Sequence, residues 1–136
     1  MTPFEMAKLH LLSGSLTRPW SESEYKILLS TDTIRFFYVE NGFLVGRLIG
    51  PDAEILNVII HPKYRRLGKA RYLIDKFEKE AKEEGSSKCF LEVAESNSRA
   101  NKLYQSLNYL SVGKRKNYYD FVDGRKDNAL ILAKEI

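Results

Sequence analysis

A basic turn with a single glycine, Arg65 to Arg71, lies between a strand-like run that stops at Pro62 and a helical pattern. The first backbone N–H groups of a helix are bare, and the helix dipole places roughly half a positive charge beside them. Gly68 has no Cβ to obstruct an anion, and Ala70 is nearly as small. The turn therefore predicts a phosphate or pyrophosphate site at a helix N-terminus. The predicted site comprises Arg65, Arg66, Leu67, Gly68, Lys69, Ala70 and Arg71.

The glycine pattern of this turn excludes two common nucleotide-binding motifs. Gly68-Lys69 is followed by Ala70 instead of Ser or Thr, and the preceding glycine of a Walker A loop is missing. A dinucleotide fingerprint would need two further glycines. From the residues alone, a basic turn that merely opens an amphipathic helix remains an alternative.

Glu92 is a carboxylate in an otherwise apolar, strand-like run, Lys88–Ala94. Side chains alternate between the two faces of a strand, so Glu92 shares a face with Phe90 and Ala94. Apolar surroundings favour the proton-bound form of a carboxyl group, which suits it to act as a general base. The alternative is an ordinary exposed glutamate on a sheet edge.

Two capping boxes predict helices near the N-terminus. Thr2–Glu5 carries one box with proline at the first helical position, and we expect this helix to run to about Leu12. Ser21–Glu24 carries the other and begins a short helix. Trp20 directly precedes this box and can pack on Tyr25 as a hydrophobic staple. The side that the pattern favours on the first helix carries Phe4, Ala7 or Lys8, and Leu11.

Strand and helix signals alternate along the rest of the chain. In order, they predict a hairpin of Phe36–Glu40 and Phe43–Ile49, a strand Ala53–Ile60, a helix from the basic turn to Gly85, a strand Lys88–Ala94, a helix capped by Asn97, and a hairpin of Tyr109–Tyr119 and Asp127–Lys134. The order predicts an α/β fold with a mixed sheet covered by helices. The strands Ala53–Ile60 and Lys88–Ala94 should run parallel, because a helix connects them.

Length and composition indicate one globular domain over residues 1–136. Hydrophobic residues make up 43% and charged residues 29%, which is ordinary for a soluble protein. The net charge of +4 suits an anionic ligand. It would also suit nucleic acid, but acidic residues interrupt most of the basic runs, so we expect no direct nucleic-acid partner.

Cysteine content and hydropathy exclude several further classes. A single cysteine, Cys89, allows neither an internal disulfide nor a multi-cysteine metal site, and we predict no metal. Cys89 lies in a strand-like run and is expected to be a small buried residue. The chain has no apolar run of spanning length and no signal-peptide pattern. We therefore expect a cytoplasmic protein without a membrane partner.

The basic turn resembles a family signature, and other segments share the resemblance. Arg65–Ala70 is similar to the R/Q-x-x-G-x-G/A signature of the GCN5-related N-acetyltransferase (GNAT) superfamily, which cradles the pyrophosphate of acetyl-CoA. Segments that resemble its ribosomal-protein-alanine N-acetyltransferase (RimI) branch are Pro19–Glu22, Leu91–Asn97, Leu103–Leu107, Asn117–Tyr119 and Asp123–Asp127. The similarity runs from about Pro19 to Ile136.

The resemblance implies the GNAT fold, acetyl-CoA as cofactor and roles for particular residues. This fold has a mostly antiparallel sheet, one parallel pair around the cofactor site and about four helices. Glu92 takes the place of the proton acceptor and Tyr104 that of the proton donor, although a tyrosine on an apolar helix stripe can be a core residue. The strand amides of Val58, Ile59 and Ile60 match those that pair with acetyl and pantetheine groups. Asn97 matches a cofactor contact, although its helix-capping role is sufficient by itself.

The resemblance also places three aromatic residues at the acceptor site, Trp20, Tyr118 and Tyr119. The alternatives are a helix staple for Trp20 and strand-end packing for the two tyrosines. The chain departs from the family pattern at Asn108, where glycine is usual, but asparagine tolerates the left-handed conformation that the turn needs. His61 replaces a common aspartate and is expected to be structural.

Together these features predict an acetyl-CoA-dependent N-terminal acetyltransferase. As the resemblance implies, its protein partner would be the N-terminus of a substrate, namely the N-terminal alanine of a small-subunit ribosomal protein. Alternatives are a lysine or small-molecule amine acetyltransferase on the same fold, a non-catalytic acyl-CoA-binding module, or an RNA-binding protein using Lys114–Lys116. The presence of both Glu92 and Tyr104 argues against a pure binding module. The oligomeric state is not predicted.

Overall fold

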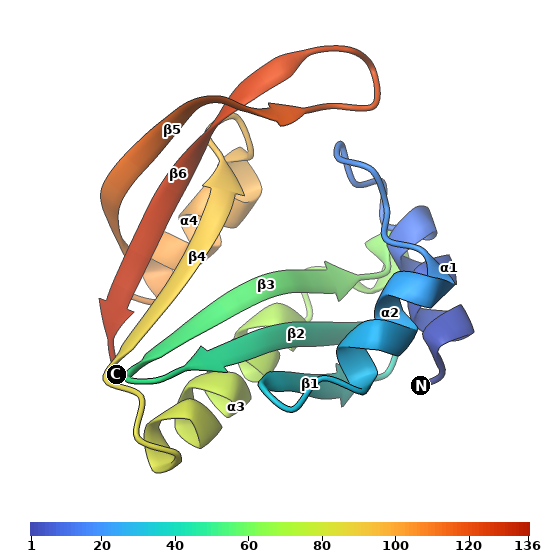
Figure 1. Ribbon diagram of the computed structural model, residues 1–136. Coiled ribbons are helices and arrows are strands. Elements are labelled where there is room, and N and C mark those ends of the chain that lie inside the picture. The colour runs from blue at the N-terminus through green and yellow to red at the C-terminus, as the bar shows by residue number, and fades with distance from the viewer.

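The computed structural model describes residues 1–136 and contains one six-stranded sheet with helices on both faces (Figure 1). The elements are α1 (Pro3–Leu12), α2 (Glu22–Leu29), β1 (Ile34–Val39), β2 (Gly42–Ile49), β3 (Asp52–Ile60), a 3-10 turn (Pro62–Tyr64), α3 (Lys69–Glu83), β4 (Lys88–Ala94), α4 (Ser98–Ser106), β5 (Leu110–Asp120) and β6 (Lys126–Glu135). The predicted order of helices and strands is confirmed. None of the helices combines the length and apolar composition that crossing a lipid bilayer requires.

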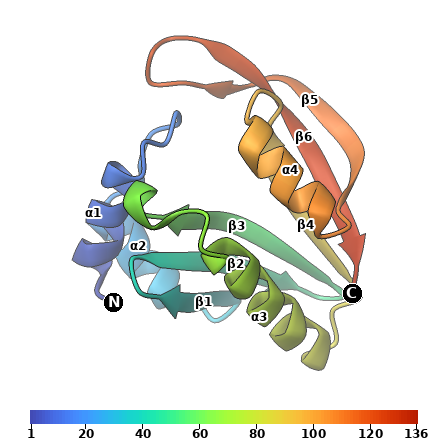
Figure 2. The same cartoon turned by 180° about the vertical axis from the view of Figure 1, so that it is seen from behind.

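The strand order in the sheet is β1-β2-β3-β4-β6-β5. Only β3 and β4 run parallel, with α3 as the connection between them, and every other neighbouring pair is antiparallel. The view from behind in Figure 2 shows α3 and α4 on one face, whereas α1 and α2 cover the β1–β3 half of the other face. The mixed sheet with one parallel pair and four α-helices is as predicted.

Local sequence signals set the helix starts and the tight turns. The hydroxyls of Thr2 and Ser21 each accept the backbone N–H of the glutamate three residues ahead. Their own backbone N–H groups donate to the side chain of that glutamate, which completes both capping boxes. Asn41 at the β1–β2 turn and Asn108 after α4 adopt φ values of 61° and 71°. Asparagine tolerates this left-handed region better than other non-glycine residues. The expectation for Asn108 is confirmed.

The predicted side of α1 is wrong. Phe4 and Leu11 are 60% and 67% exposed, whereas Met6, Leu9 and His10 are buried. These three residues pack in a small core between α1, α2 and the sheet, together with Tyr25 of α2. The sequence pattern missed this side because it includes a histidine, which counts as polar.

Candidate active site

The parallel strands β3 and β4 separate halfway along their length. Their ladder runs only from Asp52–Lys88 to Ile55–Leu91, after which β3 continues beside β2 and β4 continues beside β6. A bulge at Leu56 marks this point, because Val45 pairs with Asn57 but Gly46 pairs with Ile55. Figure 1 shows the two strands diverging toward their carboxyl ends. The divergence leaves one edge of each strand without a strand partner.

Two amides at the end of β3 face this gap. His61 donates its N–H to Asn41 O at 2.9 Å, on the β2 side of β3. Backbone N–H groups alternate in direction along a strand, so those of Ile60 and Val58 are directed away from β2 and into the gap. The N–H of Ile59 is directed toward β2, and its side chain is buried under α1 and α2. Of the three predicted strand amides, only two are therefore open to a ligand.

The N-terminus of α3 presents further free amides beside the same gap. Tyr72 donates the first helical hydrogen bond, to Gly68 O at 3.0 Å, so the N–H groups of Lys69, Ala70 and Arg71 have no intrahelical partner. Gly68 is the N-cap at φ 74°, without a side-chain cap, and the space where its Cβ would stand is open. These amides and the open space beside them fit an anionic group such as a pyrophosphate.

Most of the predicted basic side chains are engaged elsewhere. The Arg65 guanidinium donates to the carbonyls of Ser13 and Ile60. The ammonium group of Lys69 bonds to Glu40 O, and Arg71 Nη2 donates to Ser106 Oγ at 2.8 Å. Lys69 and Arg71 can therefore serve an anion at this site through their backbone N–H groups. The exposed Leu67 is not among the residues that line the cavity, which departs from the prediction.

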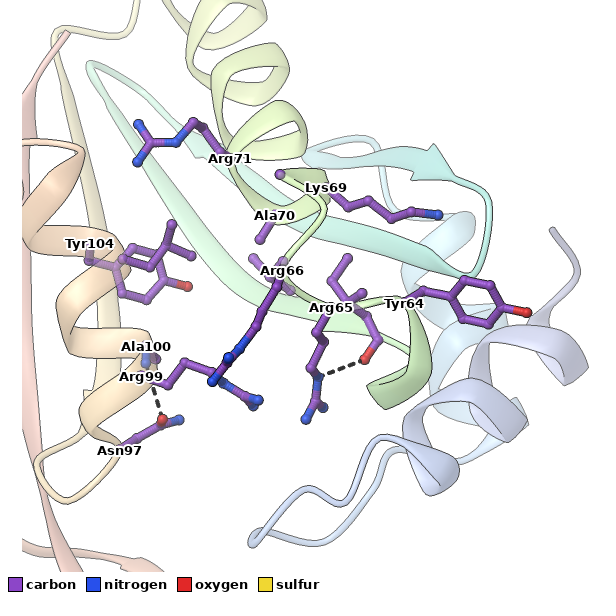
Figure 3. Close-up of a pocket in the computed structure, with 14 residues that line it drawn as sticks. Tyr64, Arg65, Arg66, Lys69, Ala70, Arg71, Asn97, Arg99, Ala100 and Tyr104 are labelled. Atoms are coloured by element: carbon purple, nitrogen blue, oxygen red, sulfur yellow. Dashed lines mark hydrogen bonds between the residues drawn. The ribbon is translucent and has the colours of Figure 1, made fainter.

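Two arginines, Arg66 and Arg99, supply the free positive charge. Both side chains line the same cavity beside the N-terminus of α3 (Figure 3), and neither takes part in an ion pair. Arg99 was not predicted. It lies in the first turn of α4, where a cation opposes the helix dipole. That unfavourable position is a sequence signal that could have indicated an anionic ligand.

Two cavities meet at the gap between β3 and β4. One, of about 310 Å³, lies between the starts of α3 and α4. The other, of about 870 Å³, lies on the opposite side and is lined by Trp20, Glu92, Tyr118 and Tyr119. The residues that line both are Val58, Ile60, Arg65, Asn97, Arg99, Ala100 and Tyr104. The two cavities therefore adjoin at the gap between the two strands.

Tyr104 lies at the junction of the cavities. It is 8% exposed, its ring packs edge-on against Tyr109 at 5.7 Å, and Figure 3 shows its hydroxyl pointing into the cavity. No protein group hydrogen-bonds to that hydroxyl. Burial raises the pKa of Tyr104, and burial together with the charge of Glu92 raises the pKa of Tyr119. Both phenols are therefore protonated near neutral pH, and each can donate a hydrogen bond.

Glu92 lies on the predicted face of β4 but has a cationic neighbour. Cys89, Leu91 and Val93 are buried on the opposite face, as the alternation requires. The Glu92 side chain is 25% exposed, and its Oε1 lies 3.2 Å from Arg115 Nε. The expectation of purely apolar surroundings is therefore corrected. The Glu92 carboxylate therefore lies beside a charged partner at the larger cavity.

The loop after α1 and the β5–β6 hairpin close the larger cavity. We call residues 13–20 the acceptor loop. Trp20 donates its N–H to His10 Nδ1 at 3.0 Å and packs against Tyr25 at 5.7 Å, so the staple is formed and Trp20 also faces the cavity. Val122 of the hairpin donates its N–H to Leu16 O at 2.7 Å. This bond joins the two segments over the cavity.

Two further predicted residues have the expected local roles. Asn97 Oδ1 accepts the N–H of Ala100 at 3.2 Å and caps α4, while it also lines both cavities. His61 Nδ1 accepts the N–H of Lys63 and caps the short 3-10 turn. His61 is not among the residues that line either cavity.

Comparison with known proteins agrees with this geometry. The model of the acetyltransferase (GNAT) family matches residues 7–109. The chain belongs to the GNAT family. It is 31% identical over 131 residues to the ribosomal protein bS18-alanine N-acetyltransferase of Escherichia coli, covering 93% of this chain and 88% of the relative. The ribosomal protein bS18-alanine N-acetyltransferase of Haemophilus influenzae is 33% identical over 119 residues, covering 85% of this chain and 81% of the relative.

A solved structure shows the same architecture as this GNAT chain. The crystal structure of the ribosomal-protein-S18-alanine N-acetyltransferase from Escherichia coli superposes with a TM-score of 0.83 at 27% identity, covering 96% of this chain and 84% of that one. Acetyl-CoA is the cofactor of the family. The free amides at the start of α3 and at the end of β3 fit its pyrophosphate and its amide-bearing arm.

Proposed function

We propose that this GNAT protein acetylates the α-amine at the N-terminus of a protein, and that its target is the N-terminal alanine of a small-subunit ribosomal protein. The observation that carries the proposal is that a cavity with free helix amides and a cavity lined by Glu92 adjoin at the gap between β3 and β4, where seven residues line both. The bS18-alanine acetyltransferases that resemble the chain over most of its length support this choice of substrate. We further propose that the protein acts in the cytoplasm, where such a substrate is synthesised.

The smaller cavity is the proposed cofactor site. In this assignment, the amides of residues 69–71 and the charges of Arg66 and Arg99 hold the pyrophosphate. The open amides of Val58 and Ile60 pair with the pantetheine arm and with the acetyl carbonyl. Bound acetyl-CoA supplies an activated acetyl thioester at the gap between the strands. Asn97 and Ala100 form the wall on the α4 side.

Two side chains move protons in the proposed reaction. Glu92, which lies beside Arg115, accepts the proton that the incoming α-ammonium group must lose. As the new C–N bond forms and the C–S bond breaks, Tyr104 donates a hydrogen bond, and then its proton, to the departing sulfur. The second proton that the nitrogen loses restores the phenol. The pKa of Tyr104 is raised by burial, so this transfer is uphill and requires the phenol to lie within hydrogen-bond reach of the sulfur. A backbone N–H at the open edge of β3 stabilises the negative charge that develops on the carbonyl oxygen.

A single carboxylate base can deprotonate an α-amine more easily than a lysine side chain. A peptide α-amine has a pKa of about 7.7–8.0 and lysine one of about 10.4, a difference of ~3.4 kcal/mol in the cost of deprotonation. At pH 7.4 roughly a quarter of α-amines are neutral, against about one lysine in a thousand. The bond between Val122 and Leu16 also closes the larger cavity on one side, which suits the end of a chain better than an internal loop.

Intact-mass analysis of ribosomal proteins tests the proposed substrate. Small-subunit proteins are compared from cells with and without this protein, and from cells carrying only the Glu92→Gln variant. We expect one protein that begins with alanine to lose its N-terminal acetyl group in the second and third samples. Unchanged N-termini in all three samples would contradict the ribosomal substrate.

A further inference from the structure

The side chain of Arg65 connects two segments that are 52 positions apart. Its Nη2 donates to Ser13 O at 2.7 Å, and its Nε donates to Ile60 O at 3.2 Å, the bond drawn as a dashed line in Figure 3. The side chain is partly buried, forms no ion pair and lines both cavities. Two backbone carbonyls therefore bind the guanidinium group of Arg65, which the sequence motif predicted to bind a phosphate.

Ser13 is the point at which the acceptor loop leaves α1. It is the buried C-cap of the helix, its hydroxyl donates to His10 O at 2.6 Å, and Gly14 follows in the left-handed conformation at φ 74°. Most residues of the acceptor loop line the larger cavity. The direction in which the loop crosses that cavity is therefore set where Arg65 holds the Ser13 carbonyl.

The other attachments of the acceptor loop come from elsewhere in the fold. Leu16 is held by the β5–β6 hairpin and Trp20 by His10 of α1. Arg65 is thus the link from the basic turn to the loop. The same guanidinium also donates to the carbonyl of Ile60. This carbonyl and the N–H of Ile60 lie on the same side of β3, facing the gap.

We infer that Arg65 is a positioning residue for the acceptor peptide and not a pyrophosphate ligand. The inference rests on the proposed function, because it takes the occupant of the larger cavity to be a peptide. A hydrogen bond from a charged donor to a buried carbonyl is among the stronger polar contacts in a protein. Without the hydrogen bond from Arg65, the acceptor loop loses its attachment on the cofactor side. The free amides at the start of α3 do not depend on this bond and stay in place.

Two neighbouring arginines provide a matched test. Arg65→Met and Arg66→Met remove the same charge one residue apart, and Arg66 has no protein partner. Calorimetry measures acetyl-CoA affinity, and steady-state kinetics measure KM for a peptide that begins with alanine. We expect Arg65→Met to raise the peptide KM by about 10-fold or more and to leave acetyl-CoA affinity within about 2-fold. Arg66→Met should weaken acetyl-CoA binding and leave the peptide KM near the wild-type value.

Hydrogen exchange provides a second readout that a simple loss of stability would not mimic. In Arg65→Met, the amides of the acceptor loop should exchange faster while those in the body of α3 are unchanged. Arg65→Lys keeps the charge but cannot bridge two carbonyls in the same way, so we expect only partial recovery of the peptide KM. This variant also keeps the test usable if Arg65→Met folds poorly.

Three results separate the possible failures. A loss of acetyl-CoA affinity in Arg65→Met as large as in Arg66→Met would overturn the inference and return Arg65 to the pyrophosphate. An unchanged peptide KM in Arg65→Met would also overturn it. Failure of the wild-type protein to acetylate any peptide N-terminus would instead contradict the proposed function, whatever the variants do.

Discussion

Arg115 Nε lies 3.2 Å from Oε1 of Glu92, so the proposed base on β4 faces a cation that belongs to the neighbouring hairpin. The same guanidinium lies over the ring of Tyr118, 5.5 Å from its centre. An arriving α-ammonium group must approach Glu92 in the presence of this cation. The base, its counter-ion and the aromatic rim of the acceptor cavity therefore form one connected group.

Replacing Glu92 by glutamine tests its role as proton acceptor. The amide keeps the volume but cannot accept a proton, so kcat should fall roughly 100-fold or more while acetyl-CoA affinity is unchanged. Glu95→Gln is the matched control, because Glu95 pairs with Lys114 at 2.6 Å but is not among the residues that line the cavities. Equal kcat values for both variants and the wild type would remove Glu92 from the mechanism.

Substitutions of Tyr104 and Tyr109, whose rings pack against each other, should have separate effects on catalysis and on stability. The Tyr104 hydroxyl has no protein partner, so Tyr104→Phe should lower kcat and leave the unfolding free energy nearly unchanged. The Tyr109 hydroxyl donates to Glu78 Oε2 at 2.7 Å, so Tyr109→Phe should cost about 1 kcal/mol of stability and keep kcat. Thermal unfolding and steady-state kinetics on both variants check this. A Tyr104→Phe enzyme with full activity would show that another group protonates the sulfur.

Gly68 can be tested against a glycine of the same conformation. Gly68 and Gly50 have φ values of 74° and 59°, with open space where a Cβ would stand. Aspartate should strain both backbones by a similar amount of about 1 kcal/mol. Only Gly68→Asp places a negative charge beside the free amides of α3, so only this variant should lose acetyl-CoA affinity in calorimetry. Equal affinities for the two variants would contradict the pyrophosphate assignment.

The helices, their caps and the hairpins could be predicted because their signals are local. Each capping box pairs residues three positions apart, and the Asn41-Gly42 turn defines its hairpin within two residues. Glu92 and Tyr104 were reached through the family resemblance and the alternation along β4. The sequence therefore contained the outline of the fold, and every predicted site residue except Leu67 lines one of the two cavities.

The contacts of the charged side chains could not be predicted, because their partners are distant in the sequence. Arg65 binds the carbonyl of Ser13, 52 positions away, and Arg71 binds Ser106, 35 positions away. Arg115 was seen only as part of a basic run. The buried side of α1 was also missed, since it depends on how α2 and the sheet pack against His10. Which amides of β3 are free depends on where β4 diverges, which no local pattern records.

Stability should fall in acid because of His10. Burial, reinforced by Arg18 and opposed by Glu24, lowers the pKa of His10 to about 4, whereas the unfolded chain has an ordinary histidine near 6.5. Above about pH 6.5 neither state binds the proton and stability is unaffected. Between pH 6.5 and 4 only the unfolded state binds it, so stability falls by about 3 kcal/mol and then levels off.

Urea unfolding between pH 7.5 and pH 4.5 checks this prediction. The pH dependence should be shallower in His10→Gln, which has no group to titrate at this position. Equal slopes in the wild type and the variant would show that His10 is not held in its neutral form.

Acetylation of a single peptide tests the central claim most directly. The peptide begins with alanine and carries one internal lysine, and mass spectrometry locates the acetyl group after incubation with acetyl-CoA. We predict acetylation of the α-amine, no acetylation of the lysine, and no reaction when the N-terminus is blocked. Robust acetylation of the lysine in the blocked peptide would contradict the assignment as an N-terminal acetyltransferase.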